Sequence, residues 1–145
     1  MTDTLALRYD RASKDWHEKI ARLGYPAAYR HLVGQAGLVS RPRRVLDAGC
    51  GTGAFALALH QMSPPSQIDL LDLSGAMRRV ARQNLKREGS ADGVAYSSLL
   101  SRDLEKGAYD VILAAHLVEH LEDPSEALSV MAGAMAPGGT LLLSV

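Results

Sequence analysis

The sequence has few of the residues that mark secreted, membrane-spanning or nucleic-acid-binding proteins. It contains one cysteine, Cys50, so no disulfide can form within the chain, and nothing indicates secretion. Sixteen basic residues balance sixteen acidic ones, which argues against a protein built mainly to bind phosphate backbones. No apolar run could span a bilayer, and the N-terminus lacks a signal-peptide pattern. We therefore expect a cytoplasmic protein that binds neither membranes nor nucleic acid.

What the sequence does contain is a regular alternation of apolar strands and helical patterns. The expected strands lie near residues 45–47, 68–72, 94–96, 109–115 and 140–145. Near-continuous apolar strands separated by helices predict a parallel sheet that is covered on both faces. Right-handed crossovers make such a sheet doubly wound. The predicted fold class is therefore α/β, in a single domain.

Two helices are expected before the first strand, over about 10–23 and 25–37. Apolar residues recur there at helical spacing, and a proline suits the start of the second helix. Because these helices precede a glycine-rich turn, the segment 1–40 is predicted to form a lid over that turn. The alternative is that Trp16 and Tyr29 simply pack on the sheet.

The most informative stretch is 45–53, which reads Val-Leu-Asp-Ala-Gly-Cys-Gly-Thr-Gly. A strand, a glycine-rich turn and a helix make the first half of a βαβ nucleotide site, and the helix start can hold an anionic group. The Gly-Lys-Ser/Thr of a phosphate loop is absent. Gly49-x-Gly51-x-x-Ala54, with Asp72 downstream, also fits a relaxed dinucleotide fingerprint. A nicotinamide-dependent oxidoreductase therefore stays open at this point.

Several motifs together resemble one family. The stretch 45–53 resembles the first motif of class I S-adenosylmethionine-dependent methyltransferases, and Leu-Asp-Leu-Ser at 71–74 is similar to their second motif. Residues 109–112 resemble their fourth strand, and 137–141 the turn into their fifth. Residues 118–124 further resemble the small-molecule branch that includes ubiquinone and menaquinone biosynthesis enzymes.

This resemblance implies a fold and an activity. The fold is a mainly parallel, Rossmann-like sheet in the strand order 3-2-1-4-5, with an S-adenosylmethionine-binding core over 41–145 and the lid over 1–40. The activity is methyl transfer to an oxygen, nitrogen or carbon of a small molecule. The alternatives are a binding module or fragment without turnover, and the nicotinamide-dependent oxidoreductase. The methyl acceptor cannot be read from the sequence.

The resemblance also implies a cofactor site around the glycine turn. Backbone amides of the turn suit the cofactor's carboxylate, and Asp47 suits its ammonium. Asp72 suits the ribose hydroxyls. Alternatively, Asp47 only caps amides in the turn, and Cys50 only fills space. The family's acidic or amide residue after the third strand is missing here, so the adenine contacts stay open. The predicted cofactor-binding residues are Asp47, Gly49, Cys50, Gly51, Gly53, Asp72, Leu73, Met77, Leu99 and Ala115.

Three polar residues follow the fourth strand at helical spacing. His116, Glu119 and His120 lie at i, i+3 and i+4, so one helical face can present all three. Their order has the form of a zinc motif, but no metal is predicted, because a polar wall of the acceptor pocket is the favoured interpretation. His116 and His120 are then the candidate catalytic residues, which take a proton from the acceptor.

The last predicted strand is the most apolar one, and the chain ends inside it. The family's full sheet has two more strands after this position. We therefore expect a fragment of a longer protein rather than a naturally short member. An open apolar edge invites pairing with another molecule, so a homodimer through the fifth strand is predicted.

Overall fold

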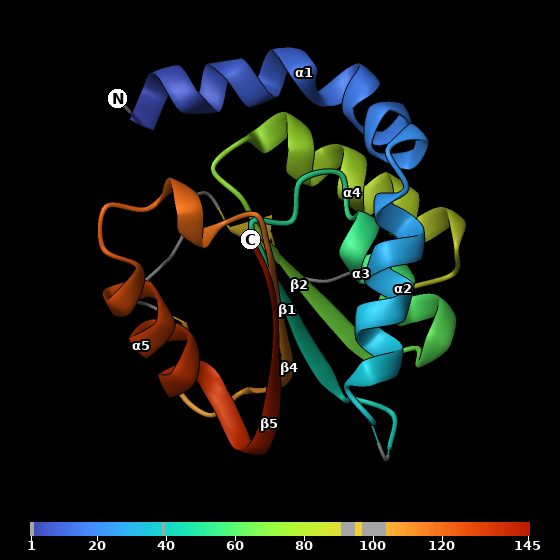
Figure 1. Ribbon diagram of the computed structural model, residues 1–145, viewed down its shortest axis with the longest axis vertical. Helices are drawn as coiled ribbons and strands as arrows, with labels where there is room; N and C mark the ends of the chain where they lie inside the picture. The colour runs from blue at the N-terminus through green and yellow to red at the C-terminus, as the bar shows by residue number, and fades with distance from the viewer. Residues whose placement is uncertain (1, 39, 91–94, 97–103) are drawn as a thin grey trace.

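The computed structural model describes residues 2–38, 40–90, 95–96 and 104–145 (Figure 1). At its centre is a parallel sheet in the expected order β3-β2-β1-β4-β5. This confirms the predicted α/β fold class. The strands are β1 (Arg44–Ala48), β2 (Gln67–Leu71), β3 (Ala95–Tyr96), β4 (Tyr109–Ala115) and β5 (Met135–Ser144).

Helices cover both faces of this sheet. Three lie on one face: α2 (Tyr25–Gln35), α3 (Ala54–Met62) and α4 (Gly75–Arg87) (Figure 1). The other face carries α5 (Pro124–Ala134) and the short 3-10 helix η1 (Val118–His120). Alternate strand residues point to opposite faces. Each central strand therefore contributes to two separate apolar cores, one under each helical layer.

The first helix, α1 (Thr2–Arg22), lies across the end of the sheet where the parallel strands finish (Figure 1). The sequence pattern placed its start near residue 10, which is wrong by two turns. The additional turns contribute Leu5 and Tyr9 to a cavity beneath the helix. Leu5 and Tyr9 are partly buried there, so contacts with the rest of the fold help to stabilise a segment whose local pattern is weak.

The fifth strand also begins earlier than expected, at Met135 rather than at Thr140. Its register against β4 shifts between the pairs Tyr109–Met135 and Val111–Thr140. The predicted Pro-Gly-Gly turn is therefore an irregularity within the strand. A Cβ at Gly139 would lie 2.9 Å from the carbonyl oxygen of Ala136, so only glycine fits there without a shift.

Side chains cap two of the helices. The Ser74 hydroxyl accepts a hydrogen bond from the amide of Met77 at 3.1 Å and starts α4. The Asp123 carboxylate accepts hydrogen bonds from the amides of Ser125 and Glu126 and starts α5. Such caps supply partners for amides that a helix leaves unpaired at its start. None of the described helices is both long and apolar enough to cross a membrane.

Candidate functional site

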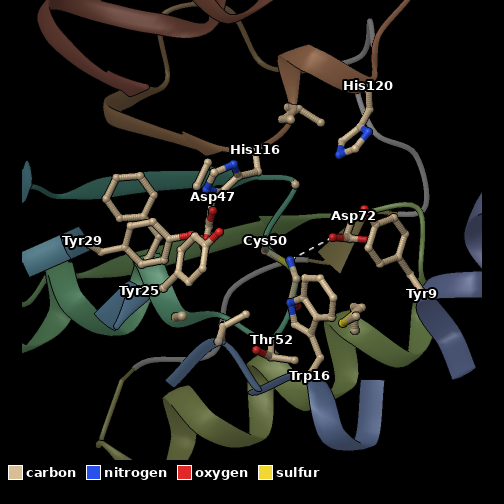
Figure 2. A pocket seen from close by; sticks show the side chains of 18 of the residues that line it. Tyr9, Trp16, Tyr25, Tyr29, Asp47, Cys50, Thr52, Asp72, His116 and His120 are labelled. Atoms are coloured by element: carbon tan, nitrogen blue, oxygen red, sulfur yellow. Dashed lines mark hydrogen bonds between the residues drawn. The ribbon is translucent and has the colours of Figure 1, made fainter. Parts of the chain in front are cut away.

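A cavity of about 410 Å³ lies beneath α1, at the carboxyl ends of β1, β2 and β4 (Figure 2). Its volume is within the range of small-molecule pockets, which is about 300–1,000 Å³. Doubly wound sheets bind their ligands outside the carboxyl ends of the strands, where the strand order reverses. In this sheet that point lies between β1 and β4. The position of the cavity therefore follows from the topology.

The glycine loop after β1 forms one side of this cavity. Gly49 and Gly51 line it, and both have positive φ, at 71° and 51°. The amides of Gly49 and Cys50 donate to the carbonyl oxygen of Leu71 at 2.6 and 3.0 Å. The amide of Gly53 donates to Cys50 at 2.8 Å. These amides therefore already have hydrogen-bond partners inside the protein. The structure gives no support to the prediction that they bind the cofactor's carboxylate.

Gly53 does not line the cavity. It caps α3 in the left-handed conformation, with φ at 86°. A Cβ there would lie 3.2 Å from both Cα and Cβ of Ala81 in α4. The glycine therefore permits the close packing of α3 on α4, which is a structural role in place of the expected ligand contact.

Asp72 joins the end of β2 to the glycine loop. Its Oδ2 accepts a hydrogen bond from the amide of Gly51 at 2.9 Å, and its Oδ1 accepts one from the amide of Ser74 at 2.8 Å (Figure 2). Burial raises the pKa of this carboxyl above its ordinary value. A carboxylate has about four lone-pair sites, so it can still accept from ligand hydroxyls in the cavity.

Asp47, at the end of β1, is only 1% exposed and lines the same cavity. Its carboxyl accepts a hydrogen bond from the amide of Ala56, which agrees in part with the capping interpretation. Its Oδ2 has no hydrogen-bond partner among the described residues. Burial, together with the nearby Asp72 carboxylate, raises the pKa of Asp47 to about 7. A cationic ligand group would supply the missing partner.

Aromatic side chains form much of the remaining wall, although the chain has only seven. Tyr29 stacks on Phe55, with ring centroids 4.5 Å apart. Tyr9 and Trp16 of α1 meet edge to face at 5.9 Å. Trp16 therefore lines the cavity and also packs against the apolar core on this face, and Tyr29 packs on α3. Five of the seven aromatic residues line the cavity: Tyr9, Trp16, Tyr25, Tyr29 and Phe55.

Polar contacts fasten α1 over the cavity. Asp10 accepts hydrogen bonds from the Ser74 hydroxyl and from the amide of Ala76, the latter at 3.2 Å, at the start of α4. Nδ1 of His17 lies 2.9 Å from the Thr52 hydroxyl of the glycine loop. These contacts tie the segment before the sheet to both loops that form the cavity. Sequence reasoning gave no signal for them.

The predicted polar wall is present, but its geometry differs from the expected helical face. His116 directly follows β4 with φ at 51°, and it is the one non-glycine residue with positive φ in the described part of the chain. Its Nδ1 lies 3.1 Å from Oε1 of Glu119, and its ring meets Tyr25 edge to face. Since η1 begins only at Val118, the expectation that one helical face presents His116, Glu119 and His120 is wrong. Among the described residues no group of His, Cys, Asp or Glu could hold a metal.

The other predicted site residues are divided between the cavity and the undescribed part of the chain. Cys50, Leu73, Met77 and Ala115 line the cavity, as do His116, Glu119 and His120. Leu99 lies outside the described residues. The sequence missed the contributions of α1, which include Lys19. Of the described residues that line the cavity, Lys19 is the one lysine or arginine.

Comparison of the sequence with known proteins identifies the family. Residues 46–141 match the family described as the methyltransferase domain. The uncharacterised protein syc1184_c of Synechococcus sp. is 36% identical over 132 residues, which cover 90% of this chain and 30% of that protein. A ubiquinone biosynthesis O-methyltransferase of Xanthomonas campestris pv. campestris is 33% identical over 126 residues, which cover 85% of this chain and 48% of that protein.

A solved structure agrees at the level of the fold. Phosphoethanolamine N-methyltransferase 2 of Haemonchus contortus, in complex with S-adenosyl-L-methionine, matches with a TM-score of 0.69 at 22% identity, over 81% of this chain and 27% of that chain. Because the family match spans more than half of this sequence, the chain belongs to the methyltransferase domain family. It covers less than half the length of the two relatives above.

Proposed function

We propose that the chain binds S-adenosylmethionine in this cavity and forms the cofactor-binding part of a small-molecule methyltransferase. One observation carries the proposal. The Asp72 carboxylate, which is joined to the glycine loop, faces a ligand-sized cavity at the switch point of the sheet. Family membership and the name of the Xanthomonas relative support the same reaction class.

The residues present fit this cofactor. Asp72 would accept from the ribose hydroxyls, and the unpartnered Oδ2 of Asp47 would face the ammonium. Lys19, rather than the loop amides, would face the carboxylate, because those amides have internal partners. The apolar side chains of Leu73 and Met77 would contact the adenine. Cys50, Gly49, Gly51 and Ala115 complete the lining around it.

When bound, the cofactor supplies an electrophilic methyl group on a sulfonium, so the chain must mainly position the acceptor and remove its proton. We assign proton removal to His116. Glu119 holds Nδ1 of that ring, which leaves Nε2 as the basic nitrogen. A strained backbone at a cavity wall is typical of functional sites. His120 has no comparable contact with Glu119 or Tyr25 among the described interactions.

The acceptor would be a small molecule with a flat apolar body and a hydroxyl or amine. Tyr25 and Tyr29 would contact the body, and His116 would take the proton. The segment 1–40 would act as the lid, since α1 and α2 both line the cavity. A module that binds the cofactor without turnover is the second candidate, because the chain covers only 30% and 48% of the relatives' lengths.

Self-association through β5 is a further part of the proposal. This strand lies at one edge of the described sheet, and Leu143 and Val145 are exposed there. Exposed apolar strand edges pair readily with other chains. Light scattering should therefore detect dimers at high protein concentration, and a strict monomer would contradict the inference. Cytoplasmic localisation stays a prediction of the sequence.

Calorimetric titration with S-adenosylhomocysteine tests the proposed function, with NAD as the control ligand. We expect saturable binding of S-adenosylhomocysteine and no heat from NAD. Binding of NAD alone would instead favour an oxidoreductase. A chain that binds S-adenosylhomocysteine should then be incubated with S-adenosylmethionine and hydroxylated aromatic compounds, because release of S-adenosylhomocysteine separates an enzyme from a binding module.

A further inference from the structure

Asp47 is a buried carboxyl group with few partners among the described residues. Its side chain lies at the carboxyl end of β1 and is 1% exposed, and Oδ2 has no hydrogen-bond partner in the described part of the chain. Burying a carboxylate with so few partners is costly, so such a group tends to keep its proton. Asp47 is also one of the residues that line the cavity (Figure 2).

The groups packed around Asp47 do not supply a positive charge. The amide of Ala56 in α3 donates one hydrogen bond to it. Asp72, from the loop after β2, adds a second carboxylate nearby. The Asp47 carboxylate acts on Tyr29 of α2 and Cys50 of the glycine loop, and burial together with that charge raises the pKa of both groups above their ordinary values. Both therefore remain neutral near pH 7.

The titratable groups farther along the cavity wall do not change this balance. Tyr25 of α2 meets the ring of His116 edge to face, and His116 already faces the carboxylate of Glu119. Lys19 of α1 has its Nζ 5.4 Å from the centre of the Trp16 ring. None of these groups forms a described hydrogen bond or ion pair with Asp47.

We propose that binding of the cofactor's methionine end expels a proton from Asp47, so that the chain binds this ligand more tightly as the pH rises. The inference rests on the proposed function. In the ligand-free chain the carboxyl is the neutral acid, which the closed surroundings favour. When the ligand's ammonium arrives, the O–H bond of the acid breaks, the proton passes to the buffer, and the carboxylate pairs with the ammonium. Charge balances, since one positive group enters as one negative group forms.

The raised pKa of Asp47 in the ligand-free chain sets the pH window. Burial and the Asp72 carboxylate raise the pKa of Asp47 to about 7 without ligand, and an ammonium partner lowers it again. Below pH 7 each unit of pH should therefore change the dissociation constant for S-adenosylhomocysteine by up to about tenfold. Above pH 7 the dependence should flatten, because the carboxyl is already ionised.

The test is calorimetric titration of the full chain with S-adenosylhomocysteine at pH 6 in two buffers with different ionisation enthalpies. The difference in heat counts the protons released, and we expect close to one per ligand. In Asp47→Asn the release should vanish and the affinity should no longer depend on pH. 5′-Methylthioadenosine, which lacks the amino-acid end, should bind the wild-type chain without releasing a proton.

A second measurement does not depend on binding heats. The carboxyl carbon of Asp47 should show the acid form by NMR at pH 6 in the free chain and the ionised form after S-adenosylhomocysteine is added. An Asp47 that is already ionised in the free chain would overturn the inference, as would proton release that survives in Asp47→Asn. Binding without any proton release would overturn it while leaving the proposed function intact. If S-adenosylhomocysteine does not bind at all, both fall together.

Discussion

The Asp72 carboxylate and the amide of Gly51 form a hydrogen bond of 2.9 Å that joins the loop after β2 to the loop after β1. The two residues are 21 positions apart in the chain. Their contact means that Asp72 has two roles, since it braces the glycine loop and also faces the cavity. A control for the bracing role exists, because the carboxylate of Asp110 also accepts backbone amides, at the other end of the sheet.

Replacing Asp72 by alanine should weaken binding of S-adenosylhomocysteine roughly ten-fold to several hundred-fold, because one or two charge-assisted hydrogen bonds are lost. Asp110→Ala is the matched control. Its carboxylate also accepts two backbone amides, from Arg43 and Arg44 at 2.7 and 3.2 Å, but at the amino end of β4. Calorimetry should find its affinity unchanged. An equal loss of affinity in both variants would mean that Asp72 acts only by bracing the loop.

The contact of α1 with the glycine loop should slow ligand release. His17→Ala removes the hydrogen bond to the Thr52 hydroxyl. Burial lowers the pKa of His17, so the wild-type ring is neutral near pH 7 and the loss is that of a neutral hydrogen bond. We expect S-adenosylhomocysteine to leave about two- to tenfold faster in stopped-flow measurements. His31→Ala, at an exposed position of α2, should leave the rate unchanged.

Gly53 should be needed for stability rather than for ligand contact. Alanine at this position combines a left-handed backbone with a Cβ 3.2 Å from Ala81, so we expect a loss of about 2–4 kcal/mol in the free energy of unfolding. Gly89→Ala has a similar φ, 77°, with nothing within 4 Å of the added Cβ. It should lose only about 1–2 kcal/mol. Equal losses in urea unfolding would show that packing on α4 is unimportant.

The buried Asp47 should also make the stability of the ligand-free chain depend on pH. Its pKa is about 7 in the folded state, against an ordinary 3.8. A raised pKa means that the folded state binds the proton more tightly than the unfolded state does. The stabilisation that this proton gives is complete below pH 3.8 and is lost as the pH rises to about 7. Asp47→Asn cannot lose that proton. In urea unfolding, the free energy of unfolding of Asp47→Asn should therefore rise relative to that of the wild type between pH 4 and 8. If the two free energies depend on pH in the same way, the raised pKa of Asp47 is contradicted.

Local patterns were sufficient for most of the fold. The limits of β4 follow from residues close in sequence, and the structure has the strand over the expected residues. The start of α1 could not be found in this way, because the turns before residue 10 are stabilised by contacts beneath the helix. The early start of β5 depends likewise on pairing with Tyr109 across the sheet.

The site residues that strand order places at the carboxyl edge could be predicted from the sequence. Those that depend on the orientation of α1 could not. Asp47 lies near the end of β1 and Asp72 directly follows β2, so both had to lie at the carboxyl edge of these parallel strands. Lys19 and Tyr9 line the cavity only because α1 crosses that edge at a particular angle, which no local pattern specifies. The partner of the Gly49 amide could not be assigned from the motif alone, since the carbonyl of Leu71 comes from the neighbouring strand.

Trp16 is the chain's single tryptophan, and it lines the cavity beside Gly51, whose added Cβ would lie 3.7 Å from the indole nitrogen. The protein thus contains a built-in optical reporter, because indole emission depends on the polarity of its surroundings. Filling the cavity should shift or quench that emission with no label attached. Ligands can therefore be screened by fluorescence on the unmodified chain, before any methyl acceptor is known.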